Sequence, residues 1–203
     1  MSAAIGLKPT PPTTSTGRHA NALEDIIYRK SFGRRAVTLS SGRESNFYFD
    51  MKPSMLDPLG AYLMAELIMQ EIVPVGGEFV GGLEMGAVPI TGAVCLHSHE
   101  IGRPVRGIFV RKKPKEHGAK KVVEGLSQGE SLAGKKVVIV EDVTTSGESA
   151  MAAVKACEEE GAQIALVISI VDREEGAADL FGKLGIPFKA LFRASTFLKR
   201  TDT

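Results

Sequence analysis

The chain has 203 residues, of which 43% are hydrophobic and 24% charged, a composition typical of one soluble globular domain with a real core. No stretch approaches the ~18 apolar residues of a membrane-spanning helix, and the polar start predicts no secretory signal. Cys95 and Cys157 are far apart and outside any metal-binding spacing, which excludes a disulfide scaffold and favours a cytoplasmic protein.

Charge is concentrated in residues 111–124, which hold six Lys or Arg and two Glu, a local charge of +4. Because the whole chain carries +1, the remaining residues sum to −3. Such a balance argues against general binding of nucleic acid. The sequence therefore predicts one cationic patch on an otherwise slightly acidic protein.

The N-terminal part of the sequence predicts a tail, and then a helix and a small hairpin that begin the domain. Residues 1–18, rich in Pro, Thr and Ser, predict a mobile tail, so that residues 19–203 form a single domain. Apolar residues recurring on one face predict a helix over 21–30. Within 34–52, two short strands flank the polar turn SSGRES, and an Asp-Pro start then predicts a helix over 57–72.

The rest of the chain alternates short apolar runs with helical patterns. Strands are predicted at 78–81, 105–110, 136–140, 164–171 and 186–192, and helices at 87–99, 148–160 and 174–184. This alternation predicts an α/β fold, a parallel sheet covered by helices on both faces. Ligands of such sheets bind beyond the carboxyl ends of the strands.

A candidate phosphate site follows the strand predicted at 136–140. That strand ends in Glu141 and Asp142, and a loop rich in Thr, Ser and Gly then leads into a helix. Free backbone N–H groups and the positive end of the helix favour phosphate there. The spacing is not that of a Walker A loop. The alternative is a strand end followed by an ordinary helix cap.

VVIVEDVTTSG, residues 137–147, resembles the ribose-phosphate signature of the type I phosphoribosyltransferases. The resemblance implies a small N-terminal hood over about 34–52 and a flexible lid over about 111–125. It implies phosphoribosyl pyrophosphate (PRPP) as substrate, with Mg²⁺ held through substrate and water and by no protein ligand. The acidic pair would contact the ribose hydroxyls and the loop the 5′-phosphate; the residues implied are Glu141, Asp142, Val143, Thr144, Thr145, Ser146, Gly147, Glu148 and Ser149.

RKKPKEHG, residues 111–118, resembles the RKxxKxHG catalytic loop of orotate phosphoribosyltransferases. Pyrophosphate leaves as the anomeric carbon becomes cationic, so positive charge must neutralise the leaving group. A solvated charge run is the alternative, and the position after a predicted strand favours a lid. The resemblance implies that PRPP is bound by Arg111, Lys112, Lys115 and His117, and that the catalytic residues are Lys115, Arg111 and Asp142.

Two more segments resemble the same family and imply the base site. SSGRESNFYFD, residues 40–50, resembles a stretch whose aromatics pack on the orotate ring, which here implies Tyr48 and Phe49. The alternative is that the aromatics fill the hairpin's own core, and for Phe47 alone the two interpretations weigh equally.

ISIVDREEG, residues 168–176, resembles a strand end whose Arg holds the orotate carboxylate, which implies Arg173 together with Thr145. A planar guanidinium can pair bidentately with a carboxylate. Asp172-Arg173 taken alone would more often be a surface ion pair.

The sequence departs from the family pattern at several positions. Ser40 stands where many members have Lys, GLEMG (residues 82–86) stands where some have a Tyr-Lys pair, and Glu141 replaces a frequent Asp. His97 and His99 form an HxH pair, but no third ligand lies nearby in sequence, so we expect no metal site there.

These observations predict transfer of the phosphoribosyl group from PRPP to N1 of orotate, giving orotidine 5′-monophosphate and pyrophosphate. The resemblance further implies a homodimer with shared active sites, and neither nucleic acid nor membrane is an expected partner. Two alternatives stay open: a phosphoribosyltransferase for another base, and a regulatory protein of this fold that binds the sugar phosphate as a signal.

Overall fold

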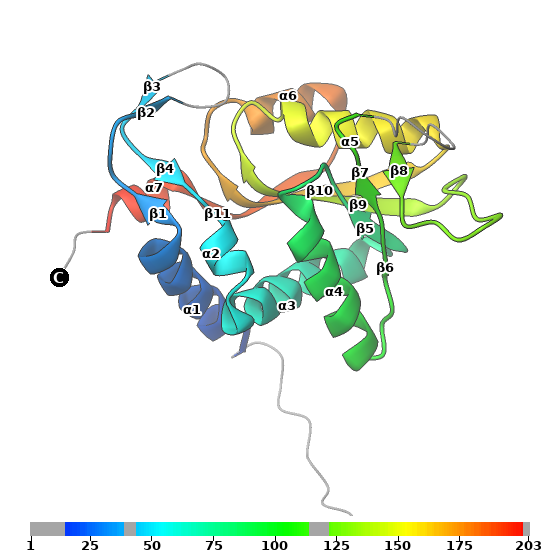
Figure 1. Ribbon diagram of the computed structural model, residues 1–203, viewed down its shortest axis with the longest axis horizontal. Coiled ribbons are helices and arrows are strands. Elements are labelled where there is room, and N and C mark those ends of the chain that lie inside the picture. The colour runs from blue at the N-terminus through cyan, green and yellow to red at the C-terminus, as the bar shows by residue number, and fades with distance from the viewer. Residues whose placement is uncertain (1–14, 39–43, 114–121, 201–203) are drawn as a thin grey trace, which may run out of the picture.

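The computed structural model describes residues 15–38, 44–113 and 122–200. Its centre is a sheet of five parallel strands in the order β11-β10-β9-β5-β6 (Figure 1). This confirms the predicted α/β fold with a parallel sheet. The strands are β5 (Phe79–Gly81), β6 (Arg106–Gly107), β9 (Lys136–Thr144), β10 (Gln163–Asp172) and β11 (Phe188–Arg193).

The strand order reverses between β5 and β9. From β5 the chain moves outward to β6, then returns to β9 on the other side of β5 and continues through β10 to β11. Loops that leave β5 and β9 at their carboxyl ends therefore diverge and leave a crevice between them. The sheet topology alone thus places the candidate site at these two strand ends.

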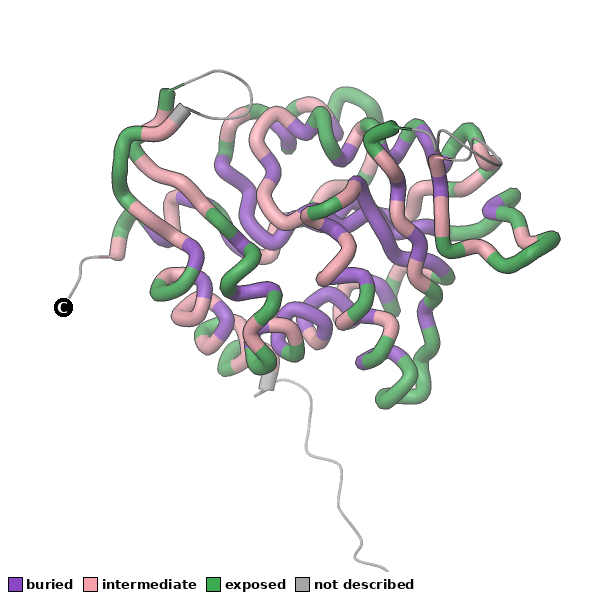
Figure 2. Tube along the Cα trace, in the orientation of Figure 1, coloured by how far each residue is buried: buried purple, intermediate pink, exposed green. Residues whose placement is uncertain are grey.

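Helices cover both faces of the sheet, as Figure 1 shows. On one face lie α3 (Pro58–Val75) and α4 (Ala87–Glu100), with α1 (Ser15–Lys30) packed against α3; on the other lie α5 (Glu148–Glu159) and α6 (Ala177–Leu184). The sheet separates two hydrophobic cores, and alternate residues of β9 point into each. Val138 and Val140 pack in one core, and Val137 and Ile139 pack in the other. Most residues of β9 and β10 are therefore buried (Figure 2), which explains the near-continuous apolar sequence of these strands.

The N-terminal hairpin has the two arms that the sequence predicts, each interrupted once. β1 (Phe32–Gly33) pairs with β4 (Tyr48–Phe49), and β2 (Val37–Thr38) pairs with β3 (Glu44–Ser45), all antiparallel. At Gly33 the Tyr48 ring lies directly over the backbone, so a Cβ there would require the ring to move. The predicted turn residue Ser40 lies outside the described residues.

The strand predicted at 105–110 bends and belongs to two sheets. Its first part is β6, and its second part, β7 (Phe109–Val110), pairs antiparallel with β8 (Val123–Glu124), which the sequence analysis missed. Ile108 and Val110 still donate their N–H groups to the carbonyls of Val80 and Gly82, at 2.9 and 2.8 Å. The predicted lid therefore begins on a two-stranded ribbon anchored beside β5.

Several element boundaries differ from the predictions for identifiable reasons. α1 begins at Ser15, inside the predicted tail, and α3 continues through Pro74 because Gly76 and Gly77 bond the last carbonyls of the helix. β9 extends four residues past Val140, paired with β10 as far as Asp172. Two short helices were not predicted, α2 (Lys52–Met55) and α7 (Ala194–Leu198). No helix among the described residues has the length and hydropathy needed to cross a membrane.

Candidate active site

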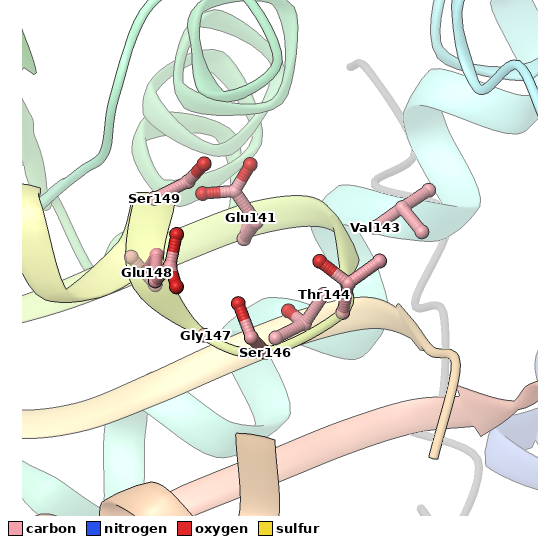
Figure 3. Close-up of a pocket in the computed structure, with 9 residues that line it drawn as sticks. Glu141, Val143, Thr144, Ser146, Gly147, Glu148 and Ser149 are labelled. Atoms are coloured by element: carbon pink, nitrogen blue, oxygen red, sulfur yellow. The ribbon is translucent and has the colours of Figure 1, made fainter. Parts of the chain in front are cut away.

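The turn from β9 into α5 encloses a cavity of about 240 Å³ (Figure 3). Gly147 is the N-cap of α5 with φ 90°, and no side chain caps the helix. The first N–H groups of α5 are therefore free to bind an anion, and the hydroxyls of the loop add further donors. The lining residues are Glu141, Val143, Thr144, Thr145, Ser146, Gly147, Glu148, Ser149 and Ala150.

The acidic pair lies within β9 rather than after its end, which corrects the predicted strand boundary at Val140. Glu141 is buried, Asp142 is half-buried, and Asp142 Oδ1 accepts the N–H of Val143 at 2.8 Å. The loop after β5 packs directly on this pair, since a Cβ on Gly86 would lie 2.6 Å from Asp142 Oδ1. Only glycine permits this close approach of the two strand ends.

Burial dominates the electrostatics of the pair. Burial, with the Asp142 carboxylate beside it, raises the pKa of Glu141 to about 8, and burial also raises the pKa of Asp142. Glu141 is therefore protonated at neutral pH in the free protein. Glu141 Oε2 and Thr144 Oγ1 are buried without a hydrogen-bond partner among the described residues. These atoms are available to the hydroxyl groups of a ligand.

A second cavity of about 520 Å³ lies between α2, the loop from β5 to α4, and the base of the lid. It shares Glu141 and Ser149 with the first cavity, so the acidic pair lies between the two. Its lining residues are Lys52, Met55, Leu56, Leu83, Glu84, Met85, Gly86, Pro89, Lys112, Glu141, Asp142 and Ser149.

Of the four predicted lid cations, the structure describes two. Lys112 lines the second cavity, and its N–H donates to Glu84 Oε1 at 3.0 Å. Arg111 Nη1 lies 3.5 Å from Glu124 Oε1 across the β7–β8 ribbon. Lys115 and His117 lie outside the described residues, so their positions stay predictions.

Arg173 follows β10 and is buried against the hairpin rather than exposed. Its Nε donates to Glu175 Oε1 at 2.7 Å and its Nη2 to Ser45 Oγ at 2.9 Å. The guanidinium also lies over the Phe47 ring, 4.2 Å from the centroid. The alternative of a surface ion pair is thereby excluded, because the guanidinium holds the hairpin against the end of the sheet.

The two predicted aromatic residues lie elsewhere on the hairpin. Tyr48 packs under Arg35, whose guanidinium is 4.4 Å from the ring centroid, and Phe49 packs against Phe32 and Phe197. Phe47 is the ring that touches Arg173. Phe47 lies between β3 and β4, and Ser45 at the end of β3 also binds Arg173.

Sequence reasoning missed Lys52 of the second cavity, because α2 has no sequence signal of its own, whereas Glu84 and Gly86 belong to the GLEMG segment that the sequence analysis singled out. The HxH pair has a structural explanation. The buried His97 bonds Glu66 at 2.7 Å and packs edge-on against Tyr62, whereas His99 is exposed. The residues that the structure describes contain no group of three His, Cys, Asp or Glu side chains placed to hold a metal ion.

Comparison with known proteins gives a consistent set of relatives. Residues 60–182 match the family model of the phosphoribosyl transferase domain. Orotate phosphoribosyltransferases of Bradyrhizobium diazoefficiens and Rhodopseudomonas palustris are 59% and 57% identical over 177 and 178 residues, which cover 87% and 88% of this chain and 95% of each relative. The Mycobacterium tuberculosis orotate phosphoribosyltransferase in complex with PRPP superposes with a TM-score of 0.72 at 31% identity, over 88% of this chain and 98% of that chain.

Proposed function

Because this chain belongs to the orotate phosphoribosyltransferase family, we infer that it transfers the phosphoribosyl group of PRPP to N1 of orotate. The products are orotidine 5′-monophosphate and pyrophosphate, so the enzyme acts in pyrimidine nucleotide biosynthesis. One observation in the structure supports this function most strongly. The acidic pair of Glu141 and Asp142 lies between two cavities, beside a helix N-terminus that no side chain caps.

The smaller cavity has the chemistry to bind the 5′-phosphate of PRPP. The N–H groups of the first turn of α5, with the hydroxyls of Thr145, Ser146 and Ser149, would bind the phosphate oxygens. The ribose hydroxyls would then lie at Glu141 and Asp142. Their O–H groups would give Glu141 Oε2 the partner that it lacks among the described residues.

Arg173 and Thr145 would orient the base, with its N1 toward the anomeric carbon. The guanidinium offers the fork of donors that a carboxylate accepts, and the weakest of its present contacts, Nη1 to the Phe47 carbonyl at 3.5 Å, is the easiest to exchange. Tyr48 and Phe49 remain proposed contacts of the ring. Phe47 joins them because it touches Arg173.

The chemical step needs charge stabilisation and exclusion of water, since the proposed site offers no covalent nucleophile. Pyrophosphate would leave into the second cavity, where Lys112 lies. Arg111, Lys115 and His117 on the lid would add positive charge as negative charge develops on the leaving group. Closure of the lid would protect the cationic sugar from water.

Mg²⁺ fits this site as a partner of the substrate. The carboxylates and hydroxyls are oxygen donors of the kind that Mg²⁺ prefers, and the described residues hold no cluster that would cage the ion. The ion would neutralise pyrophosphate charge while the protein residues position the ribose. No residue is proposed as a direct ligand.

We further propose a homodimer in which the lid of one subunit covers the site of the other. Exposed apolar residues support an interface on this side: Leu56 and Met85 line the second cavity, and Leu59, Tyr62 and Leu96 lie on α3 and α4. A two-fold axis would give both sites the same lid.

A cytoplasmic location is proposed because the two cysteines, Cys95 and Cys157, are free thiols.

A direct assay tests the reaction. The purified chain with orotate, PRPP and Mg²⁺ should consume orotate and release pyrophosphate in equal amounts. Removal of Mg²⁺ with a chelator should stop turnover, and adding the ion back should restore it. Consumption of PRPP without loss of orotate would contradict the proposed function.

A further inference from the structure

The second cavity combines few cations with several acids. Its lining contains three acidic side chains, those of Glu84, Glu141 and Asp142, but the only described cations are Lys52 and Lys112. The loop from β5 to α4 contributes no positive side chain, and its single charged residue, Glu84, is acidic. Among the described residues, Lys52 and Lys112 are therefore the side chains of this lining that can neutralise a strongly anionic group, in addition to the proposed lid cations and bound metal.

The position of the cavity identifies the group that enters it. In PRPP the 5′-phosphate and the 1-pyrophosphate project from opposite ends of the ribose. The 5′-phosphate would occupy the smaller cavity and the ribose the acidic pair, so the pyrophosphate extends into the second cavity.

Lys52 has a backbone that is anchored by buried neighbours and an ammonium group that is exposed. It opens α2, whose neighbours Met51 and Met55 are buried, and the Ser31 and Ser54 hydroxyls bond at 2.6 Å beneath the helix. Its own Nζ contacts Asp50 at 3.1 Å in an exposed pair, which is a weak interaction. The charge of Lys52 reaches Asp142 across the cavity and acts to lower the pKa of that carboxyl. The ammonium is therefore available to a ligand bound beside Asp142.

We propose that Lys52 is a pyrophosphate-binding residue of this enzyme, acting with Lys112 from opposite sides of the second cavity. The inference rests on the proposed function and extends it. Lys52 belongs to the hood and Lys112 to the base of the lid. The leaving group would thus be bound by a fixed cation from one side and by a lid cation from the other.

Binding of pyrophosphate in the presence of Mg²⁺, measured by isothermal titration calorimetry, tests this role without any base. Lys52→Ala should weaken pyrophosphate binding by about 10- to 100-fold, the loss typical of a charge-assisted contact. Lys52→Arg should recover most of the affinity. Ribose 5-phosphate, which would bind the smaller cavity, should bind Lys52→Ala as it binds the wild type.

Two controls separate a direct contact from a structural role. Lys189→Ala removes a comparable exposed, ion-paired lysine from β11 and should bind pyrophosphate normally. Asp50→Asn removes the partner of Lys52 but keeps the cation, and should also bind normally. Normal binding by Lys52→Ala, or an equal loss in Asp50→Asn, would overturn the role of Lys52. A wild type that binds no pyrophosphate would instead overturn the proposed function.

Discussion

Glu141 is a carboxyl group whose protonation is set by its position in the sheet. Glu141 lies in the central strand β9 and is buried beside the site, where burial and the neighbouring Asp142 raise its pKa to about 8. In the unfolded chain the same group would ionise near 4.5. Between these two values the folded protein holds a proton that the unfolded protein has lost.

The free protein should consequently lose stability as pH rises from about 4.5 to about 8. Glu141 alone contributes a slope approaching ~1.4 kcal/mol per pH unit within that window and none above it. Glu141→Gln should remove this contribution, as measured by urea unfolding at several pH values. Glu158→Gln, on the exposed side of α5, is the control. An unchanged slope in Glu141→Gln would show that the carboxyl is already ionised at neutral pH.

Arg173 should govern the use of orotate. Arg173→Ala removes the only proposed partner of the orotate carboxylate from a buried position, which costs ~2–5 kcal/mol in kcat/KM. PRPP affinity, measured separately, should change little. Arg193→Ala removes an exposed arginine from the end of β11 and serves as the control. Near wild-type kcat/KM for orotate in Arg173→Ala would refute the base assignment.

Among the elements, two border the proposed site: the turn from β9 to α5, and the ribbon of β7 and β8 from which the proposed lid begins. β9 is paired with β5 as far as Ile139 and with β10 as far as Thr144, so the turn leaves a strand that is held in the sheet. Among the described residues, the ribbon continues from β6 and bonds the sheet near the end of β5. The lid would therefore close onto a site that does not itself need to move.

Lys115→Ala should lower kcat far more than it weakens PRPP binding. A lid that closes mainly on the transition state contributes interactions that act on turnover. The neighbouring Lys113→Ala is a matched control, since Lys113 lies at a variable position of the RKxxKxHG pattern. Single-turnover rates and PRPP titrations separate the two quantities. Equal losses in kcat and in PRPP affinity, or equal effects of the two substitutions, would argue against a lid.

Local sequence patterns predicted the helices and strands better than they predicted element boundaries and strand pairing. Apolar runs and the Asp57-Pro58 start located the main strands and α3 correctly, because burial and capping leave a local signal. The bend between β6 and β7 and the extension of β9 depend on pairing with distant strands, which no local pattern records. Within the site, the loop between β9 and α5 was predictable for the same reason. The second cavity was not, since it is assembled from four separate segments: α2, the loop from β5 to α4, the base of the lid, and the end of β9 with the start of α5.

At the scale of the whole molecule, the shared-site dimer can be tested by mixing two inactive variants, Lys115→Ala in the lid and Asp142→Ala in the ribose site. After equal mixing and subunit exchange, half the dimers are mixed, and each has one intact composite site. Activity should recover to about a quarter of the wild-type value. If each lid served its own subunit, every site in a mixed dimer would carry one lesion. Lack of recovery, with exchange shown independently, would exclude shared sites.

The choice of base distinguishes an orotate site from a site for any other base. With PRPP and Mg²⁺ present, kcat/KM should be measured for orotate, uracil, adenine and hypoxanthine on the same preparation. Uracil is the decisive comparison, because it lacks the carboxylate that Arg173 is proposed to bind. Orotate should be preferred over uracil by at least ~10⁴-fold, since a buried polar group left unpaired strongly penalises the wrong substrate. Comparable turnover of uracil or of a purine would contradict the assignment of this site to orotate.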